Sequence, residues 1–142
     1  LGKKIGELSV NTLMDKLRFF ELAVFNFIIG NNDMHLRNFS MILGDYGWTL
    51  SSVYDLINVK LILPKDHEDT ALKLGGKKKN FSRGYFDRLG NLLELNDKQI
   101  GAVYNRLHPW LLDATLLIEQ SFLQERAQKE YISLIEKRAS VF

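Results

Sequence analysis

The chain has 142 residues, of which 46% are hydrophobic and 25% are charged, and its formal net charge is +2. This composition is that of an ordinary globular protein, so it argues against intrinsic disorder, and the small charge gives no general reason to expect nucleic-acid binding. The absence of cysteine excludes disulfides and thiolate metal sites, and no apolar run is long enough to cross a bilayer, so we expect a cytoplasmic protein.

A buried helix is expected over residues 12–29. Thr12, followed three residues later by Asp15, is typical of a helix start. Apolar residues then recur at helical spacing and spread around nearly the whole circumference, from Leu13 to Ile29. Gly30 is expected to end the helix, and the two asparagines after it to carry the turn. The helix should therefore be a central element.

A short β-hairpin is expected next, over residues 39–53. The apolar segments "FSMIL" and "GWTLSSV" flank the turn sequence "GDYG", a pattern typical of two paired strands. Residues 58–80 contain a proline and a glycine pair, so we expect irregular structure there, with a short strand at 70–74.

The remainder of the chain predicts helices. Ser82 can cap a helix over 83–93, and Asn96 or Asp97 a second helix that ends near Leu107. Pro109 suits the first turn of a third helix, and a last helix is expected over 122–138. Trp48 and Trp110 fall at apolar positions typical of a core. With no internal repeat and no linker, residues 1–142 are expected to form one unit, mainly α with a small β-hairpin.

Three polar side chains stand in the loop after the first helix, in "GNNDMHLRNFS": Asp33, His35 and Asn38. Offsets of two and five do not share a helical face, so a loop must direct them. A carboxylate and an amide oxygen are hard ligands suited to magnesium shared with phosphate. Asp55 stands just past the hairpin, which could fold back and bring a second carboxylate beside the loop.

This arrangement has the logic of phosphoryl transfer. One Asp orients the acceptor hydroxyl or takes its proton, while an Asn and a second Asp hold the magnesium that bridges the nucleotide phosphates. An Asp followed five residues later by an Asn, and then by a metal-binding Asp past a hairpin, is the spacing of protein kinases.

Other interpretations of these residues stay open on spacing alone. The segment Asp33 to Asn38 could be a turn stabilised by side-chain capping. His35 could be a packed histidine that shapes the loop, or it could contact phosphate. The run Lys77, Lys78 and Lys79 is typical of a solvated surface, although it could also meet phosphate, an acidic partner or DNA.

The segments "IGNNDMHLRNFS", "GWTLSSVYDL" and "ALKLGGKKKN", in this order, resemble the carboxy-terminal lobe of HipA-like serine/threonine kinases, the toxin kinases of bacterial toxin–antitoxin modules. The resemblance runs from about Leu13 through the final helix and implies the helical C-lobe of a protein-kinase-like fold. It implies that Asp33 is the catalytic Asp and that Asn38 and Asp55 bind Mg²⁺, with ATP as phosphate donor. A similar D-x-H-x-x-N signature in aminoglycoside phosphotransferases and lipid kinases implies that His35 approaches the transferred phosphate.

The resemblance also implies partners: a protein substrate such as an aminoacyl-tRNA synthetase, and a HipB-like DNA-binding antitoxin through which DNA is met only indirectly, with no membrane involved. HipA-like kinases carry an amino-terminal lobe with a phosphate-covering loop and an ATP-contacting lysine. Nothing before Leu13 supplies these parts, so we expect that lobe to be missing from this chain and the chain alone to be inactive.

Two alternatives to the kinase interpretation remain. The chain could be a non-catalytic module that keeps the shape of the lobe and binds a partner or DNA. It could also belong to a small-molecule phosphotransferase that shares the loop signature.

Overall fold

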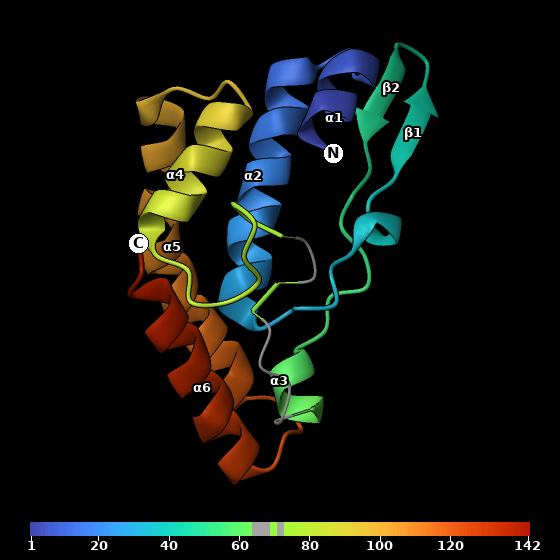
Figure 1. The fold of residues 1–142 in the computed structure, drawn as a ribbon. Helices are drawn as coiled ribbons and strands as arrows, with labels where there is room; N and C mark the ends of the chain where they lie inside the picture. Colours follow the sequence, from blue (N-terminus) through green and yellow to red (C-terminus); the bar gives the residue numbers. More distant parts are fainter. Residues whose placement is uncertain (64–68, 71–72) are drawn as a thin grey trace.

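A computed structural model describes residues 1–63, 69–70 and 73–142 (Figure 1). The described residues form helices and one two-stranded antiparallel sheet, which confirms the predicted fold class. The elements are α1 (Gly2–Leu8), α2 (Thr12–Ile29), the 3-10 helix η1 (Leu36–Asn38), β1 (Met41–Gly44), β2 (Gly47–Leu50), α3 (Val59–Ile62), α4 (Arg83–Leu92), α5 (Asp97–Glu119) and α6 (Glu125–Ala139). Among the described helices, none is both long and apolar enough to span a membrane.

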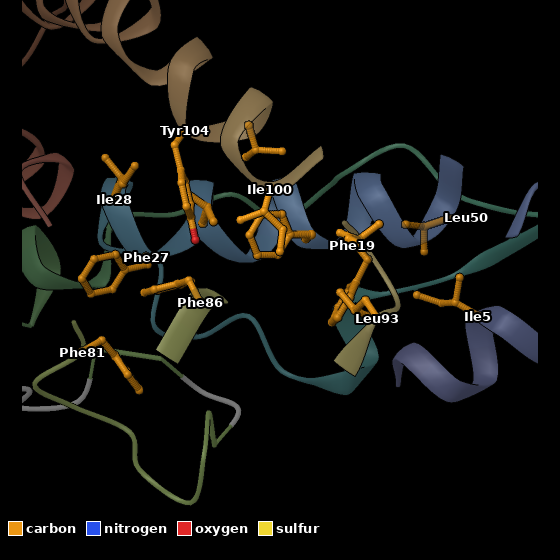
Figure 2. Close-up of a cluster of buried hydrophobic side chains, with 14 of the residues drawn as sticks. Ile5, Phe19, Phe27, Ile28, Leu50, Phe81, Phe86, Leu93, Ile100 and Tyr104 are labelled. Carbon is orange, nitrogen blue, oxygen red and sulfur yellow. The ribbon is translucent and has the colours of Figure 1, made fainter. Parts of the chain in front are cut away.

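Helix α2 is the central element, as predicted. Helix α1 and the hairpin pack near its amino-terminal part, and α4, α5 and α6 gather on its other side (Figure 1). Its residues Phe20, Val24 and Ile28 are completely buried. They lie in a core that draws side chains from nearly every element, including Ile5, Leu50, Phe81, Phe86, Leu93, Ile100 and Tyr104 (Figure 2).

A buried carboxylate attaches the hairpin to α2. Asp15 is 1% exposed, and its Oδ2 accepts hydrogen bonds from the Ser9 hydroxyl at 2.6 Å and from the Leu50 backbone N–H at 2.7 Å. Hydrogen bonds of this kind offset the cost of removing a carboxylate from water. The end of β2, from which the chain continues toward Asp55, is thereby held against the first turn of α2.

The hairpin predicted over 39–53 is confirmed, with Met41 paired with Leu50 and Gly44 with Gly47. The predicted burial of Trp48 is wrong, because this side chain is 43% exposed. Trp48 shares a face with Leu50, since alternate residues of a strand lie on one face, but it lies two residues nearer the hairpin tip. The core therefore covers only the base of the hairpin.

Two predicted helix boundaries in the carboxy-terminal half are wrong. Residues 97–119 form a single helix with Pro109 inside it, not two helices. A proline removes one helical hydrogen bond, but here Tyr104 and Leu107 before it and Trp110 and Leu111 after it all pack on the same core, and this burial offsets the loss. The last helix begins at Glu125 rather than 122, after a turn that leaves Phe122 fully exposed.

Some of the amino-terminal and middle chain differs from expectation or lies outside the described residues. Helix α1 was not predicted, because its seven residues carry one buried apolar side chain, Ile5, and no helical periodicity. Within 58–80, α3 is a four-residue helix. The strand predicted over 70–74 includes residues 71 and 72, outside the described part, while Leu74 forms an isolated bridge with Lys77.

Arg138 of α6 joins three segments of the fold. Its guanidinium, 6% exposed as a residue, donates to the Phe27 carbonyl in the last turn of α2 and to Asp69 Oδ1, the latter at 2.6 Å. Burial lowers the pKa of this guanidinium, and the Asp69 carboxylate acts in the opposite direction. Because arginine stays charged at neutral pH even so, the pair fixes the carboxy-terminal end of α2.

We expect Arg138→Met to lower the free energy of unfolding by about 2–4 kcal/mol, because it strands a buried carbonyl and leaves Asp69 without its arginine. The matched control is Arg126→Met on the same helix, whose pair with Glu130 is exposed and should contribute little to stability. Urea denaturation measures both changes. Equal losses in the two variants would contradict the assigned role of Arg138.

The conformation and close contacts of Gly30 lead to a second prediction. Its φ of 82° lies in the left-handed region, and an added Cβ would lie 2.8 Å from Asn58 Oδ1 and 2.9 Å from Leu134 Cδ2. We expect Gly30→Ala to cost about 3 kcal/mol of unfolding free energy, from backbone strain and overpacking together. Gly101→Ala is the control, since nothing lies within 4 Å of its Cβ position, and it should be neutral or stabilising. Similar results for both glycines in urea denaturation would refute this account.

Candidate active site

The loop that follows α2 carries the predicted polar residues. Gly30 ends the helix, as predicted, and its N–H donates to the carbonyls of Asn26 and Phe27. Asn31 is then 1% exposed, and Asn38, at the end of η1, is 5% exposed. Asp33 and His35 between them are exposed. The loop thus alternates side chains that fix it to the fold with side chains that face solvent.

Asn38 and Asp55 are in direct contact. The Asn38 Nδ2 donates a hydrogen bond of 2.8 Å to Asp55 Oδ2. Asp55 has a φ of 55°, a left-handed conformation that Asp tolerates better than most residues and that often marks functional positions. Since this bond uses the amide nitrogen, the Asn38 Oδ1 and the other Asp55 oxygen are left as two hard oxygen ligands on adjacent side chains.

Further hydrogen bonds hold the two segments side by side, as Figure 1 shows for the chain after α2 and the chain after β2. The Tyr54 hydroxyl donates to the Arg37 carbonyl at 2.9 Å and lies 2.7 Å from the Ser40 hydroxyl. The Ser51 N–H donates to the Ser40 carbonyl at 2.9 Å. The contact between Asn38 and Asp55 is therefore one of a series.

Asp33 lies in the same loop but is not bonded through its side chain. Its backbone N–H donates to Asn31 Oδ1 at 3.3 Å, and its carbonyl accepts from His35 N–H at 2.8 Å. Within the described part of the chain, the Asp33 carboxylate accepts no hydrogen bond and makes none to Asn38 or Asp55. This exposed carboxylate is therefore available to a hydroxyl group of another molecule.

The alternatives left open by the sequence can now be compared with the geometry. Side-chain capping does occur in the loop, but Asn31 provides it, not Asp33. His35 is exposed, so it is not a packed core histidine. In the lysine run, Lys77 lies with its Nζ 5.4 Å from the centroid of the Tyr85 ring. No described contact joins that run to Asn38 or Asp55.

The ligands fit a cation shared with another molecule better than a cation held by protein alone. In residues 1–63, 69–70 and 73–142, no three His, Asp or Glu side chains come together as a metal site. Magnesium at nucleotide sites commonly takes one or two carboxylates and completes its shell with phosphate oxygens and water. The Asn38 and Asp55 oxygens match that partial set.

Sequence reasoning missed two residues of this region. Asn31 was assigned only to the turn, although its buried side chain bonds to the backbone of both segments. Tyr54 stands next to Asp55 and bonds the loop through its hydroxyl. An Asn directly after a helix-ending Gly and a Tyr beside a candidate ligand are weak signals, because both are common in ordinary turns.

Comparison with known proteins identifies the family to which the chain belongs. The family model described as "HipA-like C-terminal domain" matches residues 3–115. A Shewanella oneidensis structure, described as a toxin–antitoxin system complex of HipA, HipB and operator DNA, superposes with a TM-score of 0.78 at 17% identity, over 98% of this chain and 34% of that one. At that identity the match shows a shared fold.

Two curated proteins are also similar. "Putative kinase Y4mE" of Sinorhizobium fredii is 31% identical over 71 residues, which is 50% of this chain and 17% of that protein. A "Putative kinase" of Haemophilus influenzae is 24% identical over 96% of this chain and 44% of that protein. The chain therefore spans less than half the length of these relatives.

Proposed function

Because this chain belongs to the HipA-like C-terminal domain family, we propose that it is the catalytic lobe of a protein kinase that transfers the γ-phosphate of ATP to a serine or threonine hydroxyl. The observation that carries the proposal is the contact of Asn38 with Asp55 beside an exposed Asp33. Kinase chemistry needs little more from this lobe, since phosphoryl transfer depends on positioning and charge neutralisation.

Each residue has a defined role in this proposal. The acceptor hydroxyl oxygen forms a bond to the γ-phosphorus, the bond from that phosphorus to the β,γ-bridging oxygen breaks, and ADP leaves. The Asp33 carboxylate orients the hydroxyl and takes its proton. His35, two residues later, is also exposed, and we assign it a contact with the transferred phosphate.

The Asn38 and Asp55 oxygens would hold Mg²⁺. The bound ion supplies positive charge that offsets the negative charge of the phosphate oxygens. The hydrogen bond between the two side chains fixes their separation before any ligand binds. Binding the ion therefore costs less conformational entropy.

We propose a substrate and partners on the same ground of family membership. We expect a protein acceptor such as an aminoacyl-tRNA synthetase, and a role as the toxin of a toxin–antitoxin module. The Shewanella complex contains HipB and operator DNA, which supports a HipB-like partner here. The matched segments make up 17% and 44% of the two curated relatives. By the resemblance to HipA-like kinases, we propose that the parts that cover ATP lie in an amino-terminal lobe of the full-length protein.

A second candidate function is a partner-binding module without catalysis. Exposed apolar side chains near the end of α5 favour it: Leu112 and Leu116, four residues apart, together with Leu117 and Phe122. A small-molecule phosphotransferase is a third candidate, which a substrate screen would separate.

Calorimetric titration of ATP into the full-length protein, with and without Mg²⁺, tests the proposal. If the chain is part of a kinase, the heat of ATP binding should require Mg²⁺, because the phosphates and the protein share the ion. Absence of nucleotide binding under both conditions would reject the kinase and favour the binding module.

A further inference from the structure

One buried side chain joins the two halves of the candidate site. Asn31 is 1% exposed. Its Oδ1 accepts from the Asp33 backbone N–H at 3.3 Å, and its Nδ2 donates to Asn26 Oδ1 at 2.8 Å and, more weakly, to the Asp55 carbonyl at 3.4 Å. One carboxamide therefore contacts the backbone of both acidic residues.

The chemistry of the three partners requires a carboxamide in one orientation. A backbone N–H can only donate and a backbone carbonyl can only accept, so Oδ1 must face Asp33 and Nδ2 must face Asp55. A carboxylate of the same shape would place an oxygen against the Asp55 carbonyl. A smaller or apolar side chain would leave the Asp33 N–H, the Asp55 carbonyl and the buried Asn26 Oδ1 without these bonds.

The partner on α2 continues the same chain of bonds. Asn26, 4% exposed, donates through Nδ2 to the Leu22 carbonyl at 2.7 Å, which leaves its Oδ1 to accept from Asn31. The Asn31 backbone N–H also donates to the Asn26 carbonyl at 2.9 Å. The loop is thus attached by two bonds to a turn of α2, the most buried of the described helices.

We propose that Asn31 is a positioning residue for the phosphoryl-transfer site, one that holds the Asp33 and Asp55 backbones in register from α2. The inference rests on the proposed function and extends it to a residue that touches neither cation nor phosphate. Residues behind metal ligands commonly change metal affinity or activity by about 10- to 100-fold when replaced.

The test is Mn²⁺ affinity, measured by electron paramagnetic resonance on the full-length protein at a temperature where each variant is folded. Asn31→Asp keeps the acceptor for Asp33 and removes the donated bonds, and Asn31→Ala removes all three. Both should weaken Mn²⁺ binding by about tenfold or more. Both should also lower kcat by a larger factor than they change the KM for ATP. Asn105→Ala, at an exposed asparagine on α5, is the control and should change neither.

The outcomes separate this inference from the proposed function. Folded Asn31 variants with wild-type Mn²⁺ affinity overturn the inference, even if their melting temperature falls, provided that Asp55→Ala abolishes binding. If Asp55→Ala leaves Mn²⁺ binding unchanged, the cation site is wrong, and the proposed function and the inference both fall.

If neither Asn31 variant folds, amide hydrogen exchange of the wild-type protein decides. Mg²⁺ should slow exchange of the Asp33 amide, because the ion stabilises Asp55 and both residues bond to Asn31. An Asp33 amide whose exchange rate does not respond to Mg²⁺ would overturn the inference.

Discussion

Replacing Asp33 with Asn should lower phosphate transfer by about 10²–10⁴-fold, the range over which general acid–base groups contribute to catalysis. The amide keeps the size of the side chain but cannot take the hydroxyl proton. Because the Asp33 carboxylate is exposed and accepts no hydrogen bond within the described residues, the free energy of unfolding should change by less than about 0.5 kcal/mol. Incorporation of labelled phosphate from ATP into protein, with the full-length enzyme, measures the loss.

Asp45→Asn is the matched control for Asp33→Asn. Asp45 is also an exposed aspartate in a tight turn, between β1 and β2, and makes no contact with Asn38 or Asp55. Its substitution should leave phosphate transfer within about twofold of wild type. Wild-type turnover in Asp33→Asn would remove Asp33 from the catalytic role.

Replacing Asp55 with Asn should raise the Mg²⁺ concentration needed for half-maximal activity and lower turnover by about 10²–10³-fold. The variant keeps an oxygen to accept the Asn38 hydrogen bond and tolerates the φ of 55°, so the local fold should persist. It removes the negative charge that a hard divalent cation requires. Turnover measured against Mg²⁺ concentration gives both numbers.

High Mg²⁺ should restore part of the Asp55→Asn activity, because part of the loss lies in affinity for the ion. Asp113→Asn, at an exposed position on α5, should show the wild-type Mg²⁺ dependence. A variant at Asp55 that is fully active at low Mg²⁺ would show that this carboxylate does not bind the ion.

Local patterns were sufficient to predict some elements and not others. The apolar periodicity of residues 12–29 and the turn "GDYG" fixed α2 and the hairpin, because both signals lie within one element. Pro109 misled the prediction because its local preference for a helix start is outweighed by long-range packing of α5 on the core. Phe122 was assigned to a helix on hydrophobicity alone, yet it lies exposed in a turn.

The sequence was sufficient to predict the chemistry of the candidate site. It was not sufficient to predict the hydrogen bonds that hold the site in place. The pairing of Asn38 with Asp55 follows from residue types and from a hairpin that returns the chain to its starting point. The role of Asn31 depends on three bonds to segments at different sequence separations, and no spacing rule contains them. Asparagine after a helix-ending glycine is ordinary turn chemistry, so its burial had to come from the structure.

The most direct test is paramagnetic broadening of the backbone amide signals by Mn²⁺ in solution. If the Asn38 and Asp55 oxygens hold a divalent cation beside Asp33, then broadening should be strongest at residues 33–38 and 54–56, and Asp55→Asn should remove it. Broadening confined to acidic residues elsewhere, such as Glu125 and Glu130 on α6, with sharp signals at residues 38 and 55, would contradict the proposed kinase site.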